Sequence, residues 1–145
     1  MRSITLAAAA ALTLSAVAAH AADPAEGEWL TQSGDAKVRI APCPGAAGRL
    51  CGNIYWLRAP QDEAGKPKQD AHNPDTSLRG RPLMGLPIIW DFKPVSAARW
   101  EGGKIYDPKT GKTYASKLRV ASDGTLKVSG CIAMFCQTQT WTRAS

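Results

Sequence analysis

Residues 113–121 read Thr-Tyr-Ala-Ser-Lys-Leu-Arg-Val-Ala, and the two faces of this stretch differ in character. One face carries mostly larger apolar side chains, namely Tyr114, Ser116, Leu118 and Val120. The other carries Ala115, Lys117, Arg119 and Ala121. A period of two indicates a half-buried antiparallel strand. Asp123-Gly124 then favours a tight reversal, after which Leu126 and Val128 alternate with polar neighbours, so the whole stretch predicts a β-hairpin.

The same alternation recurs along the chain between segments rich in Gly, Pro and Asp, whereas helical periodicity is hard to find after residue 22. Turns are expected at residues 33–35, 102–103, 107–111 and 123–124. Strands are expected at residues 27–31, 37–41, 50–58, 86–92, 98–101, 104–106, 113–121, 125–131 and 137–143. The pattern therefore predicts an all-β protein.

Short links between successive strands predict a sheet in which each strand pairs with its neighbours in the sequence. Eight or nine such strands in an open sheet would leave two exposed edges, and closure removes both. We therefore expect a single small antiparallel meander β-barrel. The exception to the short links is the polar, proline-bearing segment 59–81, which is too long for a hairpin turn and has the length of a functional or mobile connection.

The first 21 residues have the composition of a cleaved signal peptide. Arg2 precedes an apolar stretch over residues 4–17, and Ala19-His20-Ala21 supplies the small residues of a cleavage site. We expect cleavage after Ala21, which leaves residues 22–145 as a single domain. The expected location is the periplasm, or the medium if the host has no outer membrane. No later run is apolar enough to span a membrane, so no transmembrane segment is expected in the mature chain.

The charge of the chain is basic. The net charge of +6 becomes +5 once the segment containing Arg2 is removed. Outside the cytoplasm such a balance favours an anionic envelope surface as a partner, and nucleic acid is not expected. The alternative is a basic, solvated surface that only keeps the protein soluble.

The four cysteines all follow the expected cleavage point, and an even number in an oxidising compartment predicts disulfides. Four cysteines allow three pairings. We expect the two local ones, Cys43 with Cys51 and Cys131 with Cys136, because each close pair brackets a turn between strands. The CxxC spacing typical of a four-cysteine zinc site is absent, so no metal is expected there.

Seven motifs spread over residues 27–143 resemble the exported bacterial proteins of the domain of unknown function 2147 family. They are Gly27-Glu28-Trp29, Leu50-Cys51-Gly52-Asn53-Ile54, Asn73-Pro74-Asp75 with Leu78-Arg79, Gly85-Leu86-Pro87-Ile88, Trp100-Glu101-Gly102-Gly103-Lys104-Ile105-Tyr106-Asp107-Pro108, Gly111-Lys112-Thr113-Tyr114 and Gln139-Thr140-Trp141-Thr142-Arg143. The resemblance implies a lipocalin-like, calycin-type β-barrel. It implies no function, because none is assigned to that family.

Trp29 and Arg143 also resemble the pair that closes lipocalin-type barrels. The first and last strands of a closed barrel are neighbours, so an arginine on one can cover the indole of the other by a cation–π contact. The alternative is an ordinary core tryptophan and a terminal surface arginine. In either case the two residues concern closure of the barrel and not a ligand.

No motif with a catalytic mechanism is found, and we expect a protein that is not an enzyme. His72 is the only histidine after the cleavage point, which excludes a multi-histidine metal centre. Asp91, Glu101 and Asp107 could form a glycosidase-type carboxylate pair, but each is more simply a turn or surface residue. Oxygen-bearing side chains also crowd the long segment, without the spacing of an EF-hand: Asp62, Glu63, Asp70, Asn73 and Asp75. No metal or cofactor is therefore expected.

The aromatic and exposed apolar residues supply the candidate binding site. A small barrel either fills its interior with side chains or holds one small ligand. The tip Ile132-Ala133-Met134-Phe135 is apolar where a hairpin tip is normally polar, so we expect it to border the same opening as the long segment. The alternative is a tip folded inward as a plug. The expected ligand or partner rim is Trp56, Trp90, Tyr114, Ile132, Met134 and Phe135.

These observations favour an exported, non-catalytic barrel that binds a small or amphiphilic molecule. Two other functions stay open from the sequence. One is an envelope interaction protein that acts through its outer surface, and the other is a hydrolase of wall or lipid material.

Overall fold

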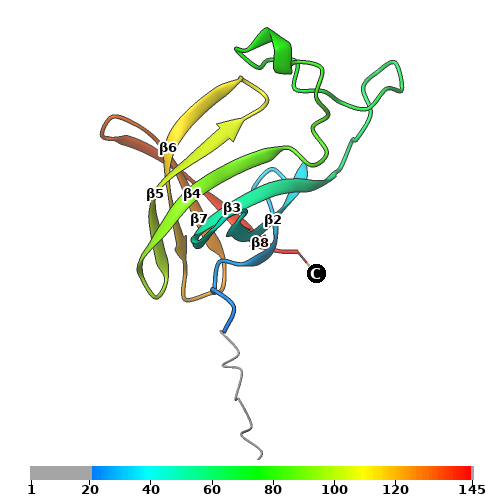
Figure 1. The fold of residues 1–145 in the computed structure, drawn as a ribbon. Helices are drawn as coiled ribbons and strands as arrows, with labels where there is room; N and C mark the ends of the chain where they lie inside the picture. Colours follow the sequence, from blue (N-terminus) through cyan, green and yellow to red (C-terminus); the bar gives the residue numbers. More distant parts are fainter. Residues whose placement is uncertain (1–20, 145) are drawn as a thin grey trace, which may run out of the picture.

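The computed structural model describes residues 21–144, which form one closed barrel of eight antiparallel strands (Figure 1). The strands are β1 (Gly27–Leu30), β2 (Ala36–Cys43), β3 (Ala46–Leu57), β4 (Pro87–Ser96), β5 (Arg99–Asp107), β6 (Lys112–Val120), β7 (Leu126–Ile132) and β8 (Phe135–Arg143). Each pairs with the next in sequence, and β8 pairs with β1. A short 3-10 helix, η1 (Thr76–Leu78), lies in the long β3–β4 loop. The predicted signal segment, apart from Ala21, falls outside the described residues.

The meander barrel predicted from the alternation is confirmed. β3 begins at Ala46 and β4 ends at Ser96, four residues outside the expected bounds in each case, and the largest correction concerns β5. Residues 98–101 and 104–106 do not form two strands joined by a turn at Gly102-Gly103. They belong to the single strand β5, whose register shifts between Trp100 and Gly103. Gly102 has a φ of +72°, and a side chain on Gly103 would come within 2.5 Å of the Phe92 ring. The two glycines therefore form a bulge that lets Phe92 pack inside the barrel.

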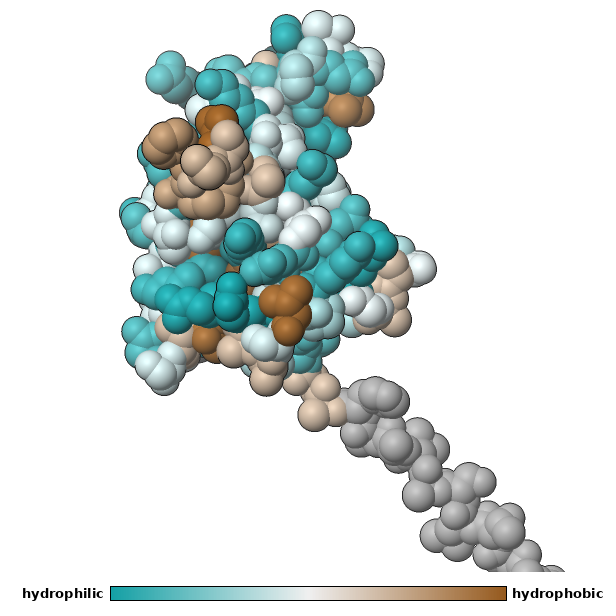
Figure 2. Space-filling view, turned by 90° about the vertical axis from the view of Figure 1, so that its left-hand side faces the viewer, coloured by the Kyte–Doolittle hydropathy of each residue, from teal (hydrophilic) through white to brown (hydrophobic). Residues whose placement is uncertain are grey.

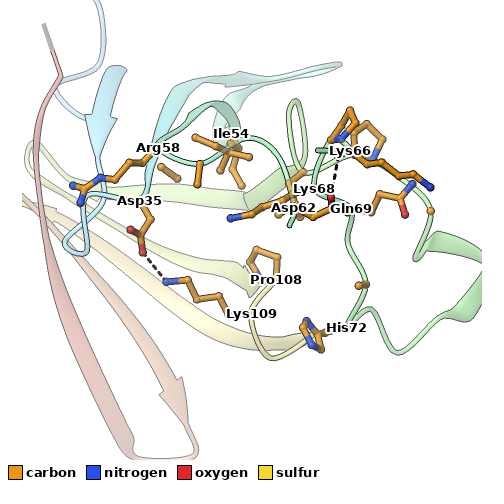
Figure 3. A pocket seen from close by; sticks show the side chains of 18 residues that line it. Asp35, Ile54, Arg58, Asp62, Lys66, Lys68, Gln69, His72, Pro108 and Lys109 are labelled. Atoms are coloured by element: carbon orange, nitrogen blue, oxygen red, sulfur yellow. Dashed lines mark hydrogen bonds and ion pairs between the residues drawn. The ribbon is translucent and has the colours of Figure 1, made fainter. Parts of the chain in front are cut away.

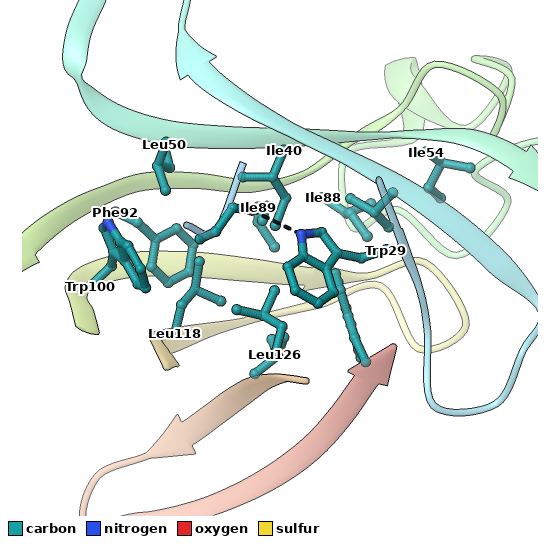
Figure 4. Packing of buried hydrophobic residues seen from close by; sticks show 14 of the residues in the cluster. Trp29, Ile40, Leu50, Ile54, Ile88, Ile89, Phe92, Trp100, Leu118 and Leu126 are labelled. Atoms are coloured by element: carbon teal, nitrogen blue, oxygen red, sulfur yellow. Dashed lines mark hydrogen bonds between the residues drawn. The ribbon is translucent and has the colours of Figure 1, made fainter. Parts of the chain in front are cut away.

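Large apolar side chains fill the middle of the barrel (Figure 4). Alternate residues on each strand point inward, so Trp29, Phe92 and Trp100 meet aliphatic residues of the other strands. The Trp29 indole nitrogen donates a hydrogen bond to the carbonyl oxygen of Ala25, at 2.8 Å, which satisfies its one polar atom in the core. The barrel interior is thus a packed core.

Two local disulfides join neighbouring strands. Cys43 is bonded to Cys51 across the β2–β3 hairpin, and Cys131 to Cys136 across the β7–β8 hairpin. This is the local pairing expected from the sequence, and it engages all four cysteines of the chain.

None of the helices in residues 21–144 has the length and apolar character that crossing a bilayer requires.

Successive strands run in opposite directions, so the connections between them alternate between the two ends of the barrel. One end carries the β1–β2, β3–β4, β5–β6 and β7–β8 connections, and we call it the loop end. The other end carries residues 23–26 and three short hairpin turns. The long β3–β4 loop of residues 58–86 rises from the loop end in Figure 1.

Candidate functional site: a cavity at the loop end

A buried carboxylate anchors the long loop to strand β5. Asp70 is fully buried, and its Oδ1 accepts a hydrogen bond from the Tyr106 hydroxyl at 2.5 Å. Its Oδ2 accepts from the Asn73 amide at 2.8 Å and from Arg81 Nε at 2.9 Å. Both carboxylate oxygens are therefore satisfied, which a buried charge requires. The four side chains hold two separate parts of the loop against the barrel.

The environment of Tyr106 keeps its hydroxyl group protonated. Burial, followed by the hydrogen bond to Asp70, raises the pKa of Tyr106 to about 12. The tyrosine therefore stays a hydrogen-bond donor to the carboxylate throughout the neutral range.

At the other side of the loop, Asp75 caps the 3-10 helix η1. Hydrogen bonds from Ser77 hold the pKa of Asp75 below its usual value.

The long loop also packs directly on the β5–β6 turn. Gly111 in that turn has a φ of +72°, and any side chain there would collide with the backbone carbonyl of His72. Glycine meets both requirements, the left-handed conformation and the close approach. The loop is thus held at two places, by Asp70 inside and by His72 on the turn.

A cavity of about 1050 Å³ lies between the loop and the barrel mouth (Figure 3). Its apolar wall includes Ile54, Leu57 and Leu83, and these residues belong to or pack against the barrel core. Its polar wall comes from three connections at the loop end, and the charged side chains there are Asp35, Arg58, Asp62, Lys66, Lys68 and Lys109. The cavity therefore offers an apolar floor beneath a mostly cationic rim, and its volume suits one small molecule.

The two carboxylates of the cavity already have partners. Asp35 accepts a hydrogen bond from Lys109 Nζ at 2.8 Å, and this bond, the largest cause, lowers the pKa of Asp35 below its usual value. Asp62 Oδ1 accepts the backbone N–H groups of Ala64 and Lys66, both at 2.9 Å, and so shapes the loop's own turn.

None of the six residues of the predicted rim lines this cavity. Trp56 lies on β3 with Lys37 Nζ 5.1 Å from its ring centroid. Trp90 lines a separate, smaller hollow of about 310 Å³ behind the Asp70 anchor. Tyr114 is half-buried on β6 opposite Ile105 of β5. The cavity is built instead from the long loop, two shorter loops and the strand residues Ala36, Ile54 and Leu57.

The apolar tip of the β7–β8 hairpin is exposed. Met134 and Phe135 are 91% and 83% exposed, and Ile132 is exposed as well. The inward plug that the sequence left open is therefore wrong. The tip lies at the loop end of the barrel, but the long loop lines the cavity and the tip does not. Figure 2 shows one compact apolar cluster in the upper part of a face that is otherwise mostly hydrophilic.

The predicted closure residues lie together at the opposite end. The Arg143 guanidinium is 4.0 Å from the Trp29 ring centroid. It also donates hydrogen bonds to the carbonyl oxygens of Glu26, at 2.6 Å, and Pro24, at 2.7 Å. Arg143 therefore joins β8 to the segment before β1 in addition to covering the indole.

The three carboxylates that the sequence offered for a glycosidase-type pair do not line the cavity, and each has partners of its own. Asp91 pairs with Arg49, and Glu101 pairs with Arg99. Asp107 accepts hydrogen bonds from the Lys109 backbone and the Thr110 hydroxyl within its own turn. Across residues 21–144 the structure gathers no group of three His, Cys, Asp or Glu side chains suited to a metal ion.

Sequence reasoning missed the residues that form the cavity and its anchor. Asp70 and Asn73 stand out in the sequence as oxygen-bearing residues of a crowded loop, and Tyr106 as part of a strand, but no local pattern links the three. The signal that the sequence did contain was the recurrence of Asn73-Pro74-Asp75 and Tyr106 among the family motifs. Lys68 carried no signal, because a lysine in a polar loop is ordinary.

A closed eight-stranded meander with a cavity at its loop end defines a lipocalin-like barrel protein. In agreement, the fold is similar to the solved structure described as "Protein HP1028 from the human pathogen Helicobacter pylori belongs to the lipocalin family". The TM-score is 0.69 and the sequence identity 25%, and the similarity covers 83% of this chain and 82% of that chain. Residues 27–143 match the family described as "Uncharacterized protein conserved in bacteria (DUF2147)", so the chain belongs to this family. No curated protein matches the chain.

Proposed function

We propose that this protein is an exported, non-catalytic barrel that binds one small amphiphilic molecule in the loop-end cavity. The observation that carries the proposal is the cavity of about 1050 Å³, in which an apolar floor lies under a polar rim. Such a combination suits a ligand with an apolar part and a polar part. The similarity to a lipocalin-family protein supports binding over catalysis.

The position of the cavity explains why binding would take place at the mouth and not inside the barrel. The middle of the barrel is occupied by Trp29, Phe92, Trp100 and the residues around them. Ile54 closes the cavity from below as part of that core. A ligand would therefore lie between the long loop and the core.

A neutral fluorescent probe tests the proposal. N-phenyl-1-naphthylamine should bind the purified protein, and Ala71→Trp should abolish binding because the new ring would occupy the cavity from its exposed wall. The matched control is Ala97→Trp, which adds the same ring at an exposed position at the opposite end. Equal binding by both variants, or no binding by the unaltered protein, would contradict the proposal. Native mass spectrometry of protein taken from its own envelope would then look for a retained molecule.

A second function is favoured by the exposed β7–β8 tip. Met134 and Phe135 expose apolar surface that a soluble domain usually covers, which suits an envelope interaction protein acting through its outer surface. Sedimentation with anionic phosphatidylglycerol vesicles tests it. This function requires that the unaltered protein sediments and that Met134→Ser combined with Phe135→Ser does not.

A further inference from the structure

Lys68 differs from the other three cations that line the cavity, Arg58, Lys66 and Lys109, which are all exposed. Its side chain is half-buried, although a lysine normally keeps its ammonium group in water. None of the ion pairs formed among residues 21–144 includes it. In Figure 3 the side chain extends from the long loop towards the β1–β2 and β5–β6 loops, across the cavity.

The neighbouring charged side chains increase the positive electrostatic potential around the Lys68 ammonium group. Asp35, the carboxylate facing Lys68 across the cavity, is bonded to Lys109, and Arg58 also contributes to lowering its pKa. Asp62 is held by the backbone of its own turn. The cavity therefore contains four cationic side chains against two carboxylates that already have partners.

The apolar floor lies next to this charge. Leu57 and Leu83 are partly buried residues packed against the core, and three prolines, Pro67, Pro82 and Pro108, extend the apolar wall. An ion pair formed at a half-buried lysine is less screened by water than one on the open surface. A negative group placed at Lys68 would thus gain more than one placed at an exposed lysine.

We propose that the loop-end cavity selects a single-chain amphiphile with an anionic head, a carboxylate or a phosphate. The head pairs with the Lys68 ammonium group, and the chain lies over Leu57 and Leu83. This inference rests on the proposed function and adds the charge of the ligand to it. A cationic head would be repelled by the same rim, and a neutral head would leave Lys68 without a partner.

Four ligands with the same ten-carbon chain test the head group. Decanoate, decyl phosphate, decan-1-ol and decylammonium are titrated calorimetrically into delipidated purified protein at low salt. We expect the two anions to bind at least about tenfold more tightly than the alcohol, and the amine to bind most weakly. The ratio of the two anions then distinguishes a carboxylate site from a phosphate site.

Two lysine variants test whether Lys68 is the source of the preference for an anionic head group. Lys68→Gln should weaken decanoate and decyl phosphate about tenfold while leaving decan-1-ol binding unchanged. The matched control, Lys93→Gln, removes the same charge from an exposed position on β4 outside the cavity and should change neither.

The outcomes separate this inference from the proposed function. If decan-1-ol binds as tightly as the anions, or if Lys68→Gln leaves anion binding intact, the anionic head is refuted while the binding function stands. If none of the four ligands binds and N-phenyl-1-naphthylamine does not bind either, both are refuted. Equal losses in Lys68→Gln and Lys93→Gln would show that net charge alone is responsible, which also refutes the inference.

Discussion

Among residues 21–144, Asp70 is the one charged residue that the fold buries completely. Removing water from a carboxylate is costly, and the cost is offset here by three donors, from Tyr106, Asn73 and Arg81. These bonds tie the long loop to strand β5 at one position. The cavity depends on that position, because residues on both sides of Asp70 line it.

Replacing Tyr106 with Phe should lower the free energy of unfolding by about 1–3 kcal/mol, since a buried oxygen of Asp70 would lose its donor. Urea denaturation measures the change. The control is Tyr114→Phe, because Tyr114 is half-buried and lies outside the Asp70 network.

The same pair of residues makes stability depend on alkaline pH. The pKa of Tyr106 is raised from 10.0 to about 12 on folding, so the folded protein holds this proton more tightly than the unfolded chain. The stabilisation is complete below pH 10 and is lost as the pH rises towards 12. The difference in unfolding free energy between the unaltered protein and Tyr106→Phe should therefore shrink over this interval. A difference that stays constant from pH 9 to 12 would contradict the raised pKa of Tyr106.

At the scale of elements, the β7–β8 hairpin differs from the others because its tip is apolar and exposed while its base is part of the barrel. The disulfide Cys131–Cys136 closes the tip across two paired residues. Strand β8 pairs with β1 only at Leu30 and Trp29, because β1 has just four residues. The hairpin therefore extends beyond the closed part of the barrel, as Figure 1 shows.

Changing Met134 and Phe135 to Ser together should leave stability within about 0.5 kcal/mol of the unaltered protein, because neither side chain is buried. Thermal melting followed by circular dichroism measures this. A loss of several kcal/mol would mean that the tip packs against the protein after all. Phe92→Ser, in the core, provides the destabilised reference.

For the whole molecule, closure at the end opposite the cavity depends on Arg143. Its guanidinium covers Trp29 and bonds two backbone carbonyls of the segment before β1. Arg143→Ala should lower the free energy of unfolding by about 1–2 kcal/mol through lost stacking and hydrogen bonds. Arg143→Lys should restore part of the cation–π contact but not both hydrogen bonds, since lysine lacks the planar fork. Equal stability of the alanine variant and the unaltered protein would show that closure does not use this residue.

The sequence by itself determined the strands, their order and the disulfides. Alternation, turn residues and cysteine spacing act between residues that are close in the chain, so residues 113–131 already contain the information for their hairpin. The clearest error of the strand prediction was at Gly102-Gly103, because glycines in a turn and in a bulge look alike without the partner side chain of Phe92.

The tertiary structure alone decided the site. Asp70 meets Tyr106 across 36 residues of sequence, and Asp35 meets Lys109 across 74. Lys68 differs from the other cations of the cavity because the fold half-buries it. The sequence also did not determine whether Met134 and Phe135 are exposed, since an apolar tip can fold inward or outward. Burial and the pairing of charges depend on which distant segments the closed barrel brings together, and local sequence patterns do not encode those distances.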